Sequence, residues 1–210
     1  MIESSQLLFF MSAALALLLL PGPAVLYITA RSTTQGRMAG LVSVLAVETA
    51  NFLQAIAAAL GLSAILLSSA LAFDIVKYLG AAYLIYLGVR KLMSSDEHVE
   101  TEEVKRESLS RIFWQGFAIN ILNPKTALFF FAFLPQFIDP SRGNVVIQNL
   151  MLGGIFVGMA IITDSLYALL ASSLAGKMAG NKGFQKGQRY FAGLVYIGLG
   201  ITTALTGSKK

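Results

Sequence analysis

The stretch "LLLLPGPAVLYITAR", residues 17–31, places two prolines around a glycine inside a strongly apolar segment. Pro21 and Pro23 each lack a backbone N–H, and each disfavours a continuous helix through its position. A helix break leaves backbone groups unpaired, so at membrane depth it must line a cavity or be buried in protein. The stretch is therefore either a proline kink filled by a neighbouring helix or part of a binding site, and we favour the site.

The composition places this segment in a membrane protein. The chain of 210 residues is 56% hydrophobic and 13% charged, with a mean hydropathy of +0.69, whereas a soluble domain is about a quarter charged. It contains no cysteine, which excludes disulfides, thiol redox chemistry and cysteine-ligated metals. Its one histidine, His98, lies in a polar stretch. Histidine-based nucleophilic catalysis is therefore hard to assemble, and we expect neither an enzyme nor a cofactor.

Six segments are long enough, or nearly long enough, to cross a bilayer, which takes about 20 apolar residues. They lie near residues 7–30, 39–67, 75–92, 112–137, 145–175 and 190–206. The charged stretch 93–111 separates residues 1–92 from residues 112–210. The sequence thus predicts an all-α integral membrane protein with three transmembrane helices on either side of a solvated linker.

The distribution of positive charge predicts the orientation of these helices. Most Lys and Arg residues follow the first, third and fifth segments, and the opposite face holds Lys77, Arg142, Lys209 and Lys210. Because cytoplasmic loops carry the excess of Lys and Arg, the linker should be cytoplasmic and both termini should lie outside. The same bias accounts for the net charge of +5 without a nucleic-acid partner.

The two halves resemble each other. "KYLGAAYLIYLGV" (77–89) aligns without gaps on "RYFAGLVYIGLGI" (189–201), the second and fifth segments align with Asn51 on Asp164, and the first and fourth align around Pro23 and Pro124. Since three helices is an odd number, the second half must insert upside down. The chain is therefore expected to form two inverted three-helix repeats, a plan in which the binding site lies at interrupted helices near the membrane midplane.

The two interruptions supply the first candidate site residues. A helix that starts after Pro23 presents its free N–H groups and positive dipole end to the break, which favours an anion such as a carboxylate. The candidates at the breaks are Pro21, Gly22, Pro23 and Ala24 in the first half, and Asn123, Pro124 and Lys125 in the second.

Ionisable residues inside the apolar segments supply the remaining candidates. Glu48 lies within the second segment with Asn51 one turn later, Asp164 is alone in the fifth, and Lys125 follows the second break. Each such group costs at least about 2.5 kcal/mol to insert, so it usually faces the interior and marks a pathway. Two carboxylates and one ammonium near the midplane predict a proton- or cation-coupled site. Alternatively, Lys125 pairs permanently with one acid as a structural tie.

The stretches around the two breaks carry a resemblance to a known family. "LLPGPAVLYITARSTTQGRMAGL" (19–41) resembles the signature of the LysE/RhtB family of amino-acid exporters, and "FWQGFAINILNPKTALFFFAFLPQFI" (113–138) is similar to its second signature. "KYLGAAYLIYLGVRKL" (77–92) is similar to its third helix. The resemblance covers essentially the whole chain.

This resemblance implies a multi-pass protein of the bacterial inner membrane that exports amino acids, driven by the proton gradient. Family members handle lysine and arginine or neutral amino acids, and we favour threonine, homoserine and leucine here. The residues that match the family's motifs are Pro21, Gly22, Pro23, Asn123, Pro124 and Lys125, which carry over as pathway residues. Glu48 and Asp164 lie outside both signatures, so their role rests on the reading of the residues alone.

In the expected mechanism, the protein binds the amino acid by its carboxylate and by its ammonium group. The substrate carboxylate would lie at the helix N-terminus of residues 21–24, with or without Lys125, and its ammonium would lie at Glu48 or Asp164. A proton competing for the same acid would release the substrate outward. The expected partners are thus an amino acid, protons and membrane lipids, and a homo-oligomer is compatible with the sequence.

Three alternatives remain open at this point. Relatives in the wider superfamily move metal cations, and two acids with an asparagine offer oxygen ligands, although no acidic cluster is dense enough for a dedicated site. A membrane enzyme would need a nucleophile and a base at membrane depth, and no motif arranges them. A purely structural subunit would leave the matched breaks and buried charges without a purpose.

Overall fold

The computed structural model describes residues 4–68, 70–93 and 106–174, together with the single residues 190, 194, 197, 198, 201 and 204. All regular structure in these residues is helical. The elements, in chain order, are α1 Ser4–Leu18, α2 Pro23–Gln35, α3 Arg37–Ser68, α4 Ala70–Met93, α5 Leu109–Ile121, α6 Pro124–Leu128, the π-helical turn η1 Phe129–Phe133, the 3-10 turns η2 Leu134–Phe137 and η3 Pro140–Arg142, and α7 Val145–Leu174.

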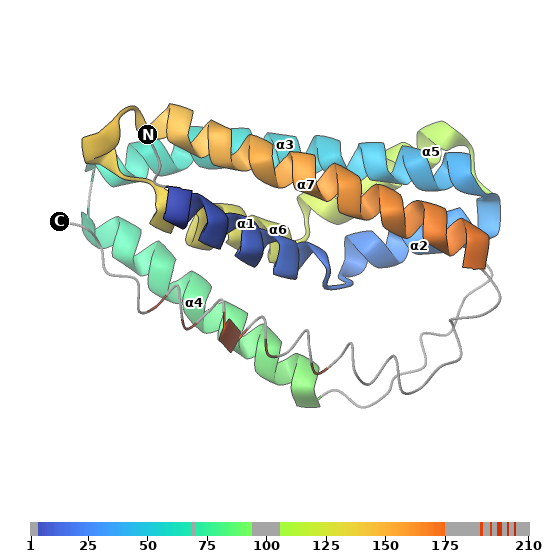
Figure 1. Ribbon diagram of the computed structural model, residues 1–210, viewed down its shortest axis with the longest axis horizontal. Coiled ribbons are helices and arrows are strands. Elements are labelled where there is room, and N and C mark those ends of the chain that lie inside the picture. The colour runs from blue at the N-terminus through green and yellow to red at the C-terminus, as the bar shows by residue number, and fades with distance from the viewer. Residues whose placement is uncertain are drawn as a thin grey trace.

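Two long helices form the centre of the described part of the chain. Figure 1 shows α3 and α7 side by side and running in opposite directions, with α1, α2, α5 and α6 packed along them. The helix α4 contacts α3 and η1. The shorter helices therefore meet one another against the α3–α7 pair.

The first predicted break is confirmed. The helix α1 ends at Leu18 and α2 begins at Pro23, and the axes of the two helices are bent by 53°. Gly22 adopts an extended conformation as the N-cap, and Pro23 occupies the first helical position. Proline is tolerated there because the N–H that it lacks would have no intrahelical partner. The prolines thus end one helix and start the next.

The second predicted break is also confirmed. The helix α5 ends at Ile121, α6 begins at Pro124, and the bend across this break is 46°. Asn123 caps α6, since its side-chain oxygen accepts a hydrogen bond of 3.0 Å from the backbone N–H of Lys125. A bent pair followed by a long helix therefore occurs twice along the chain, as α1–α2–α3 and as α5–α6–α7.

The described residues contain two helices that are long and apolar enough to cross a membrane, or four if each bent pair is one span. The two are residues 37–61 of α3 and residues 145–173 of α7. The expected span 75–92 lies within the helix α4 and is not among these candidates, and most of the expected span 190–206 lies outside the described residues. The six-span inverted repeat therefore stays a prediction.

An aromatic cluster fills the space between one end of α1, the second bent pair and α7. Its largest members are fully buried and comprise Phe10, Phe129, Phe130, Phe133 and Phe156. The rings of Phe129 and Phe156 stack with their centroids 4.4 Å apart. Such pairs stabilise by about 0.5–1.5 kcal/mol beyond the burial of their area. This cluster anchors the half of the molecule beyond the second break.

The α3–α7 contact depends on small residues. A Cβ atom built on Gly153 would lie 2.8 Å from the Cβ atom of Ala55, whereas one built on Gly154 would meet nothing within 4 Å. We expect Gly153→Ala to destabilise the protein by about 1–3 kcal/mol, because the two helix backbones must move apart. Thermal unfolding of the purified protein in detergent measures this effect.

The neighbouring glycine provides the matched control. Gly154→Ala adds the same methyl group to the same helix in open space, where alanine is favoured over glycine by about 0.5–1 kcal/mol. Its unfolding temperature should be unchanged or raised. Equal shifts for both variants would show that the close approach at Gly153 does not limit stability.

Candidate functional site

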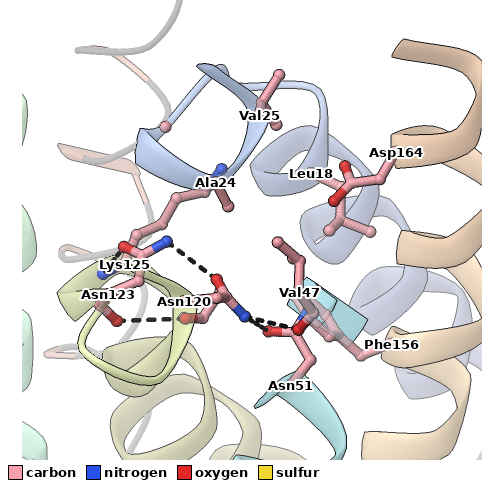
Figure 2. A pocket seen from close by; sticks show the side chains of 12 residues that line it. Leu18, Ala24, Val25, Val47, Asn51, Asn120, Asn123, Lys125, Phe156 and Asp164 are labelled. Carbon is pink, nitrogen blue, oxygen red and sulfur yellow. Dashed lines mark hydrogen bonds between the residues drawn. The ribbon is translucent and has the colours of Figure 1, made fainter. Parts of the chain in front are cut away.

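The two helix breaks, α3 and α7 meet at one small buried cavity (Figure 2). Its volume of about 20 Å³ is room for about one water molecule. Six predicted site residues line it: Gly22, Ala24, Asn51, Asn123, Lys125 and Asp164. The cavity wall also contains Leu18, Val25, Val47, Asn120, Thr126 and Phe156. Three other predicted residues, Pro21, Pro23 and Pro124, lie at the two breaks in the chain that flank the cavity.

Lys125 joins the two breaks. Its side chain, 7% exposed, extends from α6 toward α2, and its Nζ donates a hydrogen bond of 2.6 Å to the backbone oxygen of Leu20. Gly22 leaves room for this side chain, since a Cβ atom built there would lie 3.2 Å from Lys125 Cδ. The carbonyl acceptor is one that the end of α1 leaves without a helical partner. The ammonium thus satisfies a backbone group freed by the other break.

The alternative in which Lys125 pairs permanently with an acid is not what the structure contains. Among the described residues, no carboxylate lies within ion-pair distance of Lys125 Nζ, although Asp164 is near enough to interact with it electrostatically. The main-chain oxygen of Leu20 takes the place expected for a carboxylate. A buried ammonium therefore lies beside the cavity without a direct counter-ion.

The two predicted carboxyl groups lie together. Glu48 on α3 and Asp164 on α7 are each 4% exposed, and their side chains are close enough to share a hydrogen bond. Asn51 Nδ2 donates to Glu48 Oε2 over 3.0 Å, while Glu48 Oε1 and Asp164 Oδ1 have no other partner. A hydrogen bond between two carboxyl groups requires a proton on one of them. The geometry therefore fits a pair that holds one proton.

Asn120, which the sequence analysis missed, connects this region to the second break. It is fully buried, and its Nδ2 donates to Asn51 Oδ1 over 2.7 Å and to the backbone oxygen of Val47 over 2.9 Å. Asn123 Nδ2 in turn donates to Asn120 Oδ1 over 3.3 Å. The signal that was available is the spacing "NILN", which puts a second asparagine three residues before the predicted break at Asn123.

Other polar side chains hold the broken ends in place. Gln54 Nε2 donates to the backbone oxygens of Asn120 and Ile121, each over 3.1 Å, at the end of α5. The hydroxyl of Tyr167 donates over 2.9 Å to the backbone oxygen of Leu19, beside the bond that Lys125 makes. Backbone groups freed at both breaks are thus paired by side chains from other helices, as burial in a membrane requires.

The cavity is closed toward one end of the molecule by the aromatic cluster, because Phe156 both lines the cavity and stacks on Phe129. Toward the other end, a set of hydrogen bonds joins α2 to α5 and is called here the α2–α5 latch. The latch consists of the side chains of Tyr27, Arg31, Gln35 and Gln115 with the backbone of Glu107 and Ile112.

The α2–α5 latch is made of several directed bonds. Gln35 and the backbone of Glu107 form a double hydrogen bond of 2.9 and 3.0 Å, and Arg31 donates to Gln35 and Gln115 over 2.9 and 2.8 Å. The hydroxyl of Tyr27 donates to the backbone oxygen of Ile112 over 2.8 Å. The cavity thus lies between an apolar closure and a polar one, and it is too small to hold an organic ligand in this state.

The sequence is similar to a family of known membrane proteins. The family model described as LysE type translocator matches residues 15–207. The uncharacterized membrane protein YrhP of Bacillus subtilis (strain 168) is 32% identical over 210 residues, covering 96% of this chain and 99% of that protein. The homoserine/homoserine lactone efflux protein of Salmonella typhimurium is 30% identical over 179 residues, covering 84% of this chain and 85% of that protein. No solved structure matches.

Proposed function

Because the chain belongs to the family of LysE type translocators, which are transporters, we propose that it exports amino acids across the bacterial inner membrane. Its substrates are neutral amino acids such as homoserine, threonine or leucine in preference to lysine or arginine. The observation that carries the proposal is the meeting of opposite electrical poles at one cavity. Asp164, which interacts with Glu48 behind it, lines one side, and a helix N-terminus with a buried ammonium lies on the other.

The substrate carboxylate binds at the start of α2. Ala24 and Val25 line the cavity and belong to the first turn of that helix, whose N–H groups have no intrahelical partner. The dipole favours an anion there. Lys125 reaches the same place when its ammonium leaves the carbonyl of Leu20. The α-carboxylate therefore gains main-chain and ammonium donors together.

The substrate ammonium binds at the carboxyl pair of Glu48 and Asp164, across the cavity. The remaining wall is made of Leu18, Val25, Val47, Phe156 and short amide or hydroxyl side chains. Such a wall suits a small side chain, apolar or carrying one hydroxyl, because it supplies apolar contact and few polar groups. It offers no further acid for a second ammonium, which favours neutral amino acids over lysine.

Proton coupling follows from the use of one pair of acids by two cations. A proton and the substrate ammonium compete for the same carboxyl pair, so a proton entering from outside displaces the substrate outward. The exporter is then a proton antiporter and needs no separate coupling machinery. The two closures act alternately, which is how transporters with a site between two interrupted helices change access.

The orientation and location belong to the same proposal. The excess of Lys and Arg after the first, third and fifth expected segments supports a cytoplasmic linker with both termini outside. Helices apolar enough to span a bilayer, together with matches to bacterial membrane proteins, support the inner membrane.

The test is export from proteoliposomes. Purified protein is reconstituted into vesicles loaded with a mixture of labelled amino acids, a pH gradient is imposed, and mass spectrometry identifies those that leave faster than from protein-free vesicles. Gradient-dependent loss of homoserine or threonine, with lysine retained, supports the proposal. Loss of lysine alone would overturn the proposed specificity, and no loss of any amino acid would overturn the function.

Export of a metal cation is the alternative, and the same vesicles test it when they are loaded with Mn²⁺. A hard cation takes six or more oxygen ligands, so amide oxygens and water would have to complete the shell around two carboxyl groups. The described part of the chain holds no group of three His, Cys, Asp or Glu side chains placed for a metal. Movement of Mn²⁺ without amino acids would make Glu48 and Asp164 its ligands.

A further inference from the structure

A directed chain of hydrogen bonds runs from the second helix break to the carboxyl pair. The backbone N–H of Lys125 donates to Asn123 Oδ1 over 3.0 Å, and Asn123 Nδ2 donates to Asn120 Oδ1 over 3.3 Å. Asn120 Nδ2 donates to Asn51 Oδ1 over 2.7 Å, and Asn51 Nδ2 donates to Glu48 Oε2 over 3.0 Å. Each side-chain amide accepts from the side of α6 and donates toward Glu48, as can be followed up to Asn51 in Figure 2.

The ends of the chain fix its direction. A backbone N–H, as at Lys125, can only donate, so Asn123 must present its oxygen to it. The backbone oxygen of Val47 can only accept, so the amide nitrogen of Asn120 must face α3. Reversing any single amide would set two donors or two acceptors against each other. Glu48 Oε2 is therefore the acceptor at the end of the chain.

This direction assigns the position of the proton on Glu48. Because Oε2 already accepts from Asn51, the oxygen best placed to carry a proton on Glu48 is Oε1, which accepts no hydrogen bond from a protein donor. Asp164 Oδ1 is buried and likewise accepts from no protein donor, so it can accept that proton's hydrogen bond. The other titratable groups that the structure describes around the pair are Lys125 on α6 and Tyr167 on α7, and both interact electrostatically with Asp164. The proton is thus held on the carboxyl oxygen of Glu48 that takes no part in the chain of hydrogen bonds.

We propose that Asn51, Asn120 and Asn123 are positioning residues that transmit the charge of Glu48 to the hydrogen bonds capping α6, and so couple the carboxyl pair to the second helix break. This proposal rests on the role given to the pair in the proposed function. A hydrogen bond to an ionised carboxylate is about twice as strong as one to a neutral acceptor. Successive bonds in a chain polarise one another by about 10–30% each.

The consequence is a cap whose strength depends on the state of Glu48. When Glu48 is ionised, the hydrogen bonds from Asn123 to Glu48 are strengthened, and the N-cap of α6 is held firmly. When a proton neutralises Glu48, the last acceptor weakens and the cap loosens. The end of α5 does not follow, because Gln54 holds the backbone oxygens of Asn120 and Ile121 to α3. The movable part is therefore α6 with Lys125, which also carries the link to Leu20.

Hydrogen–deuterium exchange on the purified full-length protein tests this without a substrate. We expect Asn120→Leu to speed exchange of the α6 amides about tenfold, because a buried chain is cut. Glu48→Gln should also speed their exchange, and its effect should vanish in the Asn120→Leu background. The matched control is Asn149→Leu, since Asn149 is an equally buried amide on α7 that makes no hydrogen bond.

The double variant separates a relay from plain loss of packing. If Asn120→Leu only loosens the fold, its effect adds to that of Glu48→Gln, and exchange rises in α3 and α7 as well as in α6. Additive effects, or α6 exchange that is unchanged by Asn120→Leu, would overturn the proposal. Should Asn120→Leu fail to fold, Asn51→Leu cuts the next link and carries the same expectation.

An export measurement distinguishes this inference from the proposed function. Wild-type vesicles that move no homoserine in the pH gradient would overturn the proposed function, while the exchange result would still decide whether the chain transmits charge. If the wild type exports homoserine, Asn120→Leu should lower gradient-driven export about tenfold, whereas the matched control Asn149→Leu should leave it unchanged. Unchanged gradient-driven export would overturn the coupling role.

Discussion

Glu48→Gln and Asp164→Asn should each abolish gradient-driven export, lowering its rate at least about 100-fold. Removing one partner of a buried charge contact costs about 3–5 kcal/mol, and both the substrate ammonium and the proton lose an acceptor in these variants. The two side chains are 4% exposed, so water cannot replace the missing charge. The measurement is efflux of labelled homoserine from proteoliposomes under an imposed pH gradient.

The control for this result is Asn149→Ala, which changes a buried polar side chain of α7 that makes no hydrogen bond. Its export rate should stay within about twofold of the wild type, since it loses no polar contact. Full gradient-driven export by Glu48→Gln or by Asp164→Asn would contradict the assignment of the carboxyl pair as the site of competition between proton and substrate.

Lys125→Met should produce the second large effect, a loss of export of about 100-fold. The substitution keeps an unbranched side chain in the same space and removes the ammonium, which contributes about 1.5–3 kcal/mol as a charged donor. It leaves the backbone oxygen of Leu20 without its partner and the substrate carboxylate without its cation. Efflux and equilibrium binding of homoserine, measured on the same preparation, check both consequences.

Gly22→Leu tests the same contact from the other side. A side chain there meets Lys125 Cδ at 3.2 Å and displaces the ammonium, so export should fall with Lys125 still present. The matched control is Gly158→Leu, a glycine of α7 with nothing within 4 Å, which should export normally. Normal export by Gly22→Leu would mean that the position of Lys125 is not critical.

The helix breaks could be predicted from the sequence because proline acts locally. Pro21, Pro23 and Pro124 each lack a backbone N–H and disfavour a continuous helix, and the structure ends and starts helices around these positions. The two buried acids could also be predicted from the sequence, because an ionisable residue in an apolar segment is costly and needs a partner. The prolines and the acids are each recognised residue by residue, so a single sequence is enough to predict them.

The partner of Lys125 could not be predicted in the same way. A sequence shows only side-chain acids, so a carboxylate was the one protein partner that could be suggested for Lys125, as the alternative to a role in binding substrate. The acceptor is a backbone oxygen at Leu20, which becomes available only because α1 ends there and the second break folds against it. Main-chain groups freed by a break are not visible in a sequence, although they are strong acceptors once buried.

The role of Asn120 was hidden for a related reason. An asparagine in an apolar segment usually indicates an ordinary helix–helix contact. Asn120 differs because the backbone donor at Lys125 and the backbone acceptor at Val47 fix the direction of its hydrogen bonds. The α2–α5 latch was missed because its glutamines lie about 80 residues apart and follow no periodic pattern. Contacts defined by tertiary packing carry no local signal.

The α2–α5 latch lies beside the only tryptophan of the chain. Trp114 is the residue before Gln115, is 63% exposed, and packs edge-on against Phe113 and Phe117 with ring centroids 5.4 and 5.8 Å away. Indole emission depends on the polarity and mobility of its surroundings, so the protein carries an optical reporter on the same helix as the closure. No label needs to be introduced to follow that closure by fluorescence.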